Sequence, residues 1–216
     1  MDTTNYSGTN MKAKGLKKAN VRNMTVAAML SAVGFVLMYV DFSVPFVPFF
    51  LKLDVSDLPA LLASFSLGPV YGLLVSLVKN LLHLPVTQSG AIGELSNFIL
   101  CTALVVPAGM IYQHKKTKKN AILATFVGLL VMTAVSYPSN VYIIYPLYDK
   151  FIMSEEAIME VYKGVAATFF PFMNIDTMAK GILYFNVPFT FVKDLITALI
   201  TVLIYQPLRP LLKGNN

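Results

Sequence analysis

The sequence contains few of the residues that build disulfide frameworks and metal sites. Among 216 residues there are one cysteine, two histidines and no tryptophan, and charged residues make up only 13%. A single cysteine excludes an intrachain disulfide and a thiolate cluster. The histidines, His83 and His114, are too far apart for the paired-histidine motif of a membrane metalloprotease, so we expect no metal site.

Motifs of catalysis are also lacking. No glycine-rich loop ends in Gly-Lys-Ser or Gly-Lys-Thr, so the chain is not expected to hydrolyse ATP itself. Glu155 and Glu156 resemble the start of some membrane protease motifs, but no histidine supports them. A helix that begins after Ser154 explains this pair better. We therefore expect no catalytic residue and no enzymatic activity.

Hydrophobic residues are abundant, at 56% of the chain, and the mean hydropathy is +0.65. A soluble domain rarely reaches these values, so the sequence predicts an all-α integral membrane protein. Gly68-Pro69 splits one long hydrophobic run, because the residue before proline is disfavoured in a helix. The hydrophobic runs then predict six transmembrane helices, near residues 24–41, 57–66, 69–85, 91–113, 120–140 and 182–207.

Basic residues fall on one side of this predicted bundle. A basic tail, residues 1–20, precedes a single membrane domain at 21–212, and further lysines lie in the 113–120 connection. Six crossings with both termini in the cytoplasm place these groups and the basic C-terminus on the side that favours positive charge. Topology thus accounts for the net charge of +6, and no nucleic-acid partner is needed.

Lys193 and Asp194 interrupt the last hydrophobic run. A charged residue at the centre of a membrane helix costs about 2.5 to 3.5 kcal/mol on insertion scales, so it usually faces a cavity, a partner or a ligand. Asn186, Thr190 and Lys193 are spaced at i, i+4 and i+7 and share one helix face. This face is predicted to form one wall of a binding site. Asp194, about 100° away, is expected to hold Lys193 charged or to pack against another helix.

Further polar residues lie near the outer ends of the predicted helices. Glu94 and Asn97 share a face of the fourth helix, and Asn140 ends the fifth. Each alone could be a hydrogen-bonding contact between membrane helices. Together with the polar face of the last helix, they predict an outward-opening pocket that suits a planar polar molecule such as a vitamin.

Two other features leave alternatives open. The segment 41–57 contains four phenylalanines, including Phe46 and Phe49, which either form an aromatic belt at the membrane surface or belong to a lid over the pocket. Lys79 either extends its amine towards the membrane surface, pairs with a carboxylate such as Glu94, or contacts an anionic group of a ligand. We favour the ion pair.

Four segments together resemble a known family. They are LDVSDLPALL at 53–62, GPVYG at 68–72, VKNLL at 78–82 and VPFTFVK at 187–193. This combination resembles the S components of energy-coupling factor (ECF) transporters, specifically the riboflavin-specific RibU type. The resemblance implies a six-helix bundle in the bacterial cell membrane that captures riboflavin from outside. It also implies an EcfT membrane subunit and two cytoplasmic ATPases as partners, with riboflavin as the transported ligand and no cofactor.

The resemblance also implies roles for single residues. Asn97, Asn140 and Lys193 match flavin-binding positions of the RibU type, whereas Thr190 stands where asparagine is usual. A hydroxyl cannot present the two-sided edge of an amide, so a preference for the flavin nucleotides FMN or FAD stays open. The predicted substrate-binding set is Asn97, Asn140, Thr190, Lys193, Glu94, Asn186, Phe46 and Phe49.

Ala28 and Ala32 form the small-xxx-small spacing that allows close helix contact. In the family this motif docks on EcfT; the alternative is tight packing inside the bundle. Alternatives for the whole chain are an S component for another vitamin, such as thiamine or pantothenate, and a membrane-embedded enzyme or a scaffold.

Overall fold

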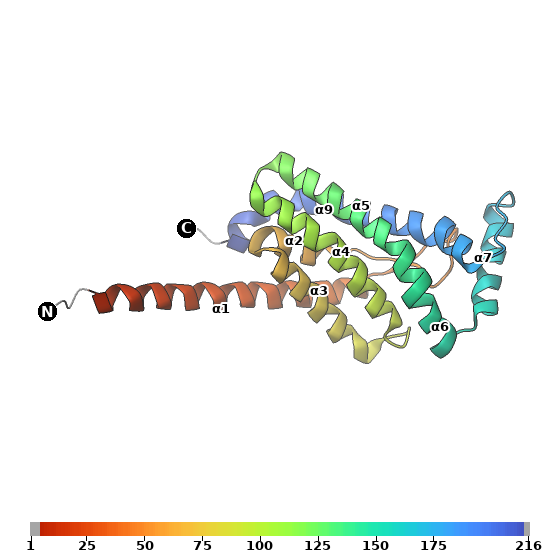
Figure 1. The fold of residues 1–216 in the computed structure, drawn as a ribbon, viewed down its shortest axis with the longest axis horizontal. Coiled ribbons are helices and arrows are strands. Elements are labelled where there is room, and N and C mark those ends of the chain that lie inside the picture. The colour runs from red at the N-terminus through yellow and green to blue at the C-terminus, as the bar shows by residue number, and fades with distance from the viewer. Residues whose placement is uncertain (1–4, 214–216) are drawn as a thin grey trace.

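The computed structural model describes residues 5–213, with the side chains of 21–205, 207 and 208. These residues are mainly helical (Figure 1). The helices are α1 (Asn5–Met38), α2 (Leu58–Leu67), α3 (Pro69–His83), α4 (Ile92–His114), α5 (Lys118–Ser139), α6 (Tyr145–Phe151), α7 (Glu155–Phe169), α8 (Met178–Gly181) and α9 (Val187–Lys213). They are accompanied by a 3-10 turn η1 (Leu84–Val86), the π-helical turns η2 (Asn140–Ile144) and η3 (Ile182–Asn186), and the short strands β1 (Phe42–Ser43) and β2 (Lys52–Leu53).

Five helical stretches are long and apolar enough to cross a membrane: Val21–Met38, Pro69–Val86, Ile92–His114, Lys118–Phe151 and Met178–Tyr205. The shorter apolar helix α2 completes the set. The predicted all-α membrane bundle is therefore confirmed, with one helix for each of the six predicted ones.

Some predicted boundaries were wrong. Helix α1 begins at Asn5, so helical backbone extends into the predicted tail 1–20. The fifth crossing continues without a break through η2 and α6. Helix α7 was not among the six predicted helices, but it does begin after Ser154, whose hydroxyl accepts a hydrogen bond from the backbone N–H of Ala157 at 3.4 Å.

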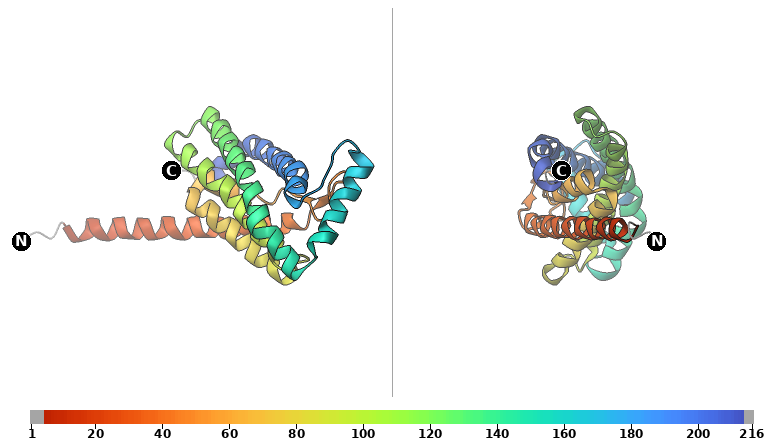
Figure 2. Two further views of the ribbon diagram at one scale, coloured as in Figure 1. Left: turned by 45° about the vertical axis from the view of Figure 1, so that its right-hand side comes forward. Right: turned by 90° about the vertical axis from the view of Figure 1, so that its left-hand side faces the viewer.

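The break between α2 and α3 follows from Gly68-Pro69. Gly68 has a φ of 113°, which a residue with a side chain rarely adopts, and Pro69 opens α3, where its missing N–H costs nothing. Helix α2 packs against α1, α3, α4 and α9, and most of its residues are buried (Figure 2). Its ten residues need not reach both membrane surfaces, because neighbouring helices surround them.

The two π-helical turns each precede a proline by two residues. Pro146 follows η2, and Pro188 follows η3. Proline cannot donate the backbone hydrogen bond that a regular α-helix requires, and a wider turn before it accommodates the ring. Each turn shifts the side chains after it out of the regular helical register. Asn140 lies within η2 and Asn186 within η3.

An aromatic cluster fills the bundle near the chain termini. Phe65, Tyr112 and Tyr205 are all buried, with ring centroids 4.7 to 5.4 Å apart. The Tyr205 hydroxyl donates to the backbone oxygen of Phe65 at 3.3 Å. We call these three residues the aromatic plug.

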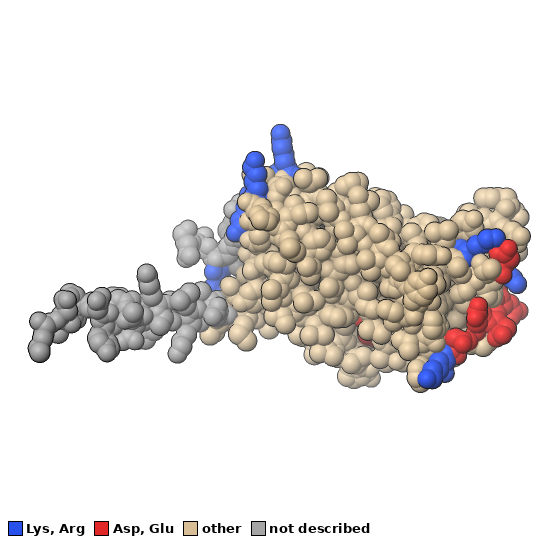
Figure 3. Space-filling view, in the orientation of Figure 1, with Lys and Arg blue, Asp and Glu red and all other residues tan. Residues whose placement is uncertain are grey.

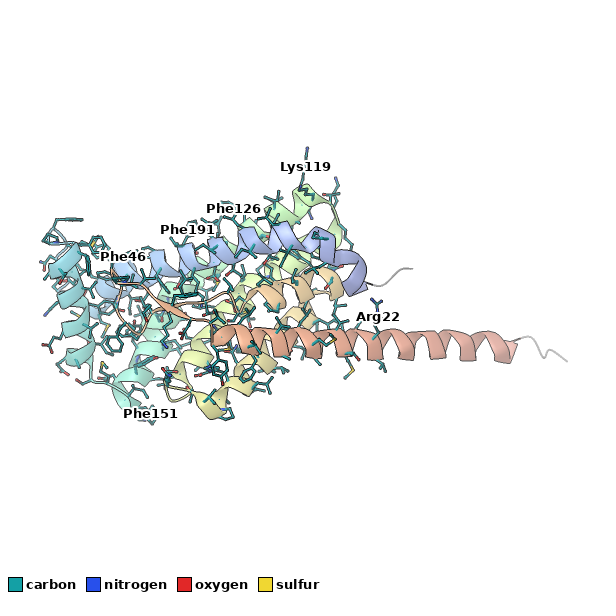
Figure 4. The ribbon with its side chains drawn as sticks, turned by 180° about the vertical axis from the view of Figure 1, so that it is seen from behind. Arg22, Phe46, Lys119, Phe126, Phe151 and Phe191 are labelled. Atoms are coloured by element: carbon teal, nitrogen blue, oxygen red, sulfur yellow. The ribbon has the colours of Figure 1, made fainter. Side chains whose placement is uncertain are left out.

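Charge is distributed unevenly along the bundle. At the end that holds both chain termini the visible charged side chains are lysines and arginines, whereas most visible acidic side chains lie at the opposite end, near α7, together with further basic ones (Figure 3). Arg22 and Lys119 mark the first end, whereas Phe46 and Phe151 lie at the other (Figure 4). Between these ends, exposed apolar side chains such as Phe126, Leu199 and Leu203 form a surface suited to lipid. We call the end with α7 the outer end, after the orientation that the sequence predicts.

Candidate binding cavity

A cavity of about 490 Å³ opens in the outer half of the bundle. Its walls come from the 39–57 segment, the outer ends of α3 and α4, the α5–η2–α6 helix, α7 and the start of α9. The volume lies within the range of small-molecule sites, roughly 300 to 1,000 Å³. Aromatic rings and a limited set of polar groups line it together, which suits a planar ligand with polar edges.

Seven of the eight predicted site residues line this cavity: Glu94, Asn97, Asn140, Asn186, Thr190, Lys193 and Phe49. Phe46 does not: it is 52% exposed and lies outside the cavity. The spacing of Asn186, Thr190 and Lys193 does place them on one cavity wall. Direct contact of these residues with a ligand stays a prediction.

Asn140 and Thr190 join the α5 and α9 walls through Ser136. The Asn140 amide donates to the backbone oxygen of Ser136 at 2.8 Å, and the Ser136 hydroxyl donates to the Thr190 hydroxyl at 3.4 Å. The amide of Asn80 donates to the Asn97 side-chain oxygen at 3.3 Å. These contacts join the α5–η2 helix to α9 and α3 to α4, and they hold the polar groups in fixed positions around the cavity.

Asn186 holds a buried network of tyrosines. Its side-chain oxygen accepts from the Tyr162 hydroxyl at 2.7 Å, and its amide donates to the Tyr145 hydroxyl at 2.7 Å. The two hydroxyls also contact each other. Burial raises the pKa of Tyr162 well above its usual range, so its hydroxyl keeps its proton. Because both ends of the amide are engaged, Asn186 fixes α7 against α6 and α9.

Two ion pairs form the deep end of the cavity. The Lys193 amine donates to a carboxylate oxygen of Asp54 at 2.7 Å. The Lys79 amine pairs with Asp57 and donates to the Ser56 hydroxyl at 2.9 Å. Lys79 and Asp57 are essentially unexposed. The ion pair predicted for Lys79 is confirmed, but its carboxylate comes from Asp57 and not from Glu94, which contacts His83 further along α3.

The positive charges of these two lysines keep the carboxyl group of Asp54 ionised. Burial alone would raise the pKa of its carboxyl, but the charges of Lys193 and Lys79 outweigh burial and lower the pKa from 3.8 to about 2. A backbone N–H from Ser56 also donates to Asp54 at 2.8 Å. The 39–57 segment is thus tied to α9 by an ion pair.

Asp194 has a different environment. Its side chain is unexposed and borders the cavity, and neither carboxylate oxygen has a hydrogen-bond partner within the described part of the chain. The sequence predicted that Asp194 either holds Lys193 charged or packs against another helix. In the structure the hydrogen-bonded carboxylate of Lys193 comes from Asp54.

Glu94 stabilises the cavity rim. One of its oxygens lies 2.7 Å from His83 Nδ1, and the other accepts from the hydroxyls of Thr87 at 2.9 Å and Ser89 at 3.1 Å. These contacts join the end of α3 to the start of α4. Glu94 therefore organises the connection 84–91 in addition to lining the cavity.

The 39–57 segment folds over the cavity as a short hairpin. β1 and β2 pair antiparallel, and Lys52 bridges to Asp41 across them at 2.8 Å. Phe50 lies edge-on to the rings of Tyr145 and Tyr162, with centroid distances of 6.3 and 5.8 Å. The aromatic belt and the lid both stay predictions for these phenylalanines. Phe49 and Phe50 border the cavity, while Phe42 and Phe46 are exposed.

Sequence reasoning missed Asp54, Asp57, Tyr145 and Tyr162 as residues of the site. One signal was present for the aspartates: two lysines inside membrane helices require two carboxylates, and the LDVSDLP segment supplies them. For the tyrosines there was no such signal, because nothing in the 149–180 connection shows that α7 folds back over the cavity.

Comparison with known proteins agrees with this architecture. The model of the family "ECF transporter, substrate-specific component" matches residues 22–205. The riboflavin transporter RibU of Staphylococcus aureus (strain TCH60) is 32% identical over 202 residues, which cover 92% of this chain and 98% of that protein. The riboflavin transporter FmnP of Bacillus subtilis (strain 168) is 28% identical, with 88% and 93% covered.

A solved structure of the S component of a bacterial ECF transporter superposes with a TM-score of 0.68 at 31% identity. The match covers 90% of this chain and 99% of that one, which confirms the predicted S-component fold. The family model and these relatives span nearly all of the membrane bundle and its cavity, and this chain therefore belongs to the substrate-specific (S) components of ECF transporters.

Proposed function

We propose that this chain is the riboflavin-binding subunit of an ECF-type vitamin importer. The observation that carries the proposal is the outer cavity, in which polar groups from α4, η2 and α9 converge among aromatic side chains. Two relatives of nearly the same length are named riboflavin transporters, which supports the choice of vitamin. As a transporter component the chain is not an enzyme, and riboflavin is its transported ligand.

Three groups are suited to hydrogen-bond the flavin. Asn97 and Asn140 each present an amide at the cavity, and Thr190 presents a hydroxyl on the facing wall. Lys193 can donate to a flavin oxygen while it keeps its contact with Asp54, because an ammonium group has three protons. Phe49, Tyr145 and Tyr148 border the same space and provide ring surfaces for the isoalloxazine.

The hairpin in 39–57 is suited to close over the bound vitamin. It already contributes Phe49, Phe50 and Asp54 to the cavity, and it covers the outer end of the bundle. Capture from outside therefore requires this segment to open and close, while the rim held by Glu94 stays in place. Delivery into the cell then depends on ATP hydrolysis in partner subunits.

The proposed partners are an EcfT membrane subunit and two cytoplasmic ATPases. Ala28 and Ala32 lie on the exposed side of α1, whereas Ala27 and Ser31 are buried against the bundle. This placement favours docking over the alternative of packing inside the bundle. The connection between α4 and α5 carries four exposed lysines at the end of the bundle that holds the termini, which supports cytoplasmic termini by the positive-inside rule. They are Lys115, Lys116, Lys118 and Lys119.

The experiment that tests the proposal uses the purified full-length chain in detergent. We expect it to carry the yellow absorption of flavin, or to quench riboflavin fluorescence at one site per chain after the ligand is removed. A preparation that is folded by circular dichroism, lacks flavin and leaves riboflavin fluorescence unchanged would refute the proposal. Any other vitamin extracted from it would redirect the substrate assignment within the same family.

A further inference from the structure

A second, smaller cavity lies at the end of the bundle that holds the chain termini, where Figure 4 labels Lys119. Its volume is about 30 Å³, and residues of α4, the α4–α5 connection, α5 and α9 line it. A water-sized group needs roughly 10 to 15 Å³, so the cavity admits single atoms of a ligand and no whole vitamin. We call it the lysine notch; its lining residues are Tyr112, Lys116, Thr117, Lys118, Ala121, Val202 and Tyr205.

The lysine notch is basic on one side and aromatic on the other. Lys116 and Lys118 are exposed, whereas Tyr112 and Tyr205 of the aromatic plug are buried. Thr117 is already engaged, because its hydroxyl accepts a hydrogen bond from the backbone N–H of Asn120 at 3.3 Å. The two ammonium groups are therefore the charged donors that the notch offers to a ligand.

The charge of these two lysines is not balanced by carboxylates of the neighbouring helices. No aspartate or glutamate occurs at 95–148 or at 195–216, which include the α4–α5 connection and the end of α9. None of the ion pairs between described residues involves Lys116 or Lys118. The notch therefore suits an anion that comes from outside the chain.

The surroundings of the notch indicate what kind of anion this is. Ile122 and Leu123 follow it on α5, Leu203 follows it on α9, and all three are exposed apolar side chains suited to lipid. The notch thus lies where apolar surface meets basic residues, as at the boundary between acyl chains and headgroups. Lysine stems can lie on such apolar surface while their ammonium groups reach the phosphates.

From this arrangement we propose that the lysine notch binds the phosphate group of an anionic phospholipid, with Lys116 and Lys118 as its contacts. A phosphate oxygen enters the notch, and the acyl chains lie along the apolar surface of α5 and α9. Lysine binds phosphate as a point charge, and basic groups at a membrane surface favour anionic lipids. The bound lipid then joins the end of α9 to the α4–α5 connection. This site is separate from the outer cavity and does not depend on which vitamin binds there.

The test uses the full-length chain in lipid nanodiscs, with one tryptophan as a reporter. The chain contains no tryptophan, so Ile122→Trp gives a single fluorescence signal. Ile122 is four residues after Lys118, on the same face of α5. Quenching by brominated phosphatidylglycerol, which is anionic, is compared with quenching by brominated phosphatidylcholine at equal mole fractions. We expect the anionic lipid to be preferred by about tenfold in relative association constant.

Two double variants separate a defined site from general attraction between lysines and anionic lipid. Lys116→Gln with Lys118→Gln removes both charges of the notch and should reduce the preference to about twofold or less. The matched control, Lys115→Gln with Lys119→Gln, removes the same charge from exposed lysines that do not line the notch, and should keep most of the preference. All four lysines are exposed, so both variants should fold, which circular dichroism checks.

A preference that is lost with the notch lysines and kept in the control supports the inference. Equal quenching by the two lipids would overturn it, and so would an equal loss in both double variants, which indicates diffuse attraction only. Inorganic phosphate should weaken the preference no more than sodium chloride of the same ionic strength does, since salt screens exposed charges. A stronger effect of phosphate would assign the notch to the free anion instead of the lipid. Riboflavin binding should be unchanged in both variants, so failure here leaves the proposed function in place.

Discussion

The ion pair between Lys79 and Asp57 allows a quantitative test of how the bundle is held together. Both side chains are essentially unexposed, so Lys79→Met leaves Asp57 buried without its counter-ion. Loss of one partner of a buried pair costs about 3 to 5 kcal/mol. For a chain of this size each kcal/mol changes the melting temperature by about 2 to 4 °C, so the variant should melt roughly 6 to 20 °C lower.

Thermal unfolding in detergent measures this change. The unfolding is monitored by the near-ultraviolet circular dichroism of the tyrosines, since the chain contains no tryptophan. The double variant Lys79→Met with Asp57→Leu removes both charges and should regain most of the lost stability, because an apolar pair of similar volume often replaces a buried ion pair at little cost. Lys119→Met is the control, since Lys119 is exposed, and should change stability by less than about 0.5 kcal/mol. A melting temperature of Lys79→Met within 2 °C of the unmodified chain, by the scale above, would refute the reasoning.

Four further predictions follow from other contacts. Lys193→Ala should weaken riboflavin binding by about 1 to 3 kcal/mol in fluorescence titrations; unchanged affinity would leave Lys193 with a structural role only. Ala28→Trp should preserve riboflavin binding but abolish uptake in cells, whereas loss of binding would favour packing inside the bundle. The pKa of Asp54 is lowered from 3.8 to about 2 on folding, so its contribution of about 2 kcal/mol is present above pH 4 and disappears as the pH falls towards 2; acid unfolding of Asp54→Asn should lack this component. Tyr162→Phe leaves the Asn186 oxygen without its donor and should lower the unfolding free energy by about 1 to 3 kcal/mol, and an effect below 0.5 kcal/mol would contradict the importance of the tyrosine network.

The fold was largely predictable because a membrane imposes length and polarity on each crossing. The hydrophobic runs and Gly68-Pro69 were sufficient to place six helices near their observed positions. Helix ends were less predictable, since the π-helical turns before Pro146 and Pro188 continue helices that a simple reading of proline would end. Short-range patterns do not show whether a proline is accommodated by a wider turn or breaks the helix.

The site was predictable where helical spacing determines direction. Asn186, Thr190 and Lys193 line the cavity because residues at this spacing share a face. The partners of the lysines were not predictable in the same way. The contact between Lys193 and Asp54 joins residues 139 positions apart, and it depends on how an irregular segment folds back into the bundle. The same limit applies to Phe46 and Phe49, three residues apart in a loop that has no periodicity to assign their directions.

The aromatic plug has a consequence for the resting cell. A water-accessible cavity thins the insulating part of the membrane at that point, and a membrane potential of 100 mV corresponds to about 2.3 kcal/mol for each charge that crosses. Phe65, Tyr112 and Tyr205 are buried, pack their rings against one another and do not line the cavity, so ring surface occupies this part of the bundle interior. Close-packed rings leave no room for a continuous file of water molecules there, so an idle subunit should conduct no protons across the membrane.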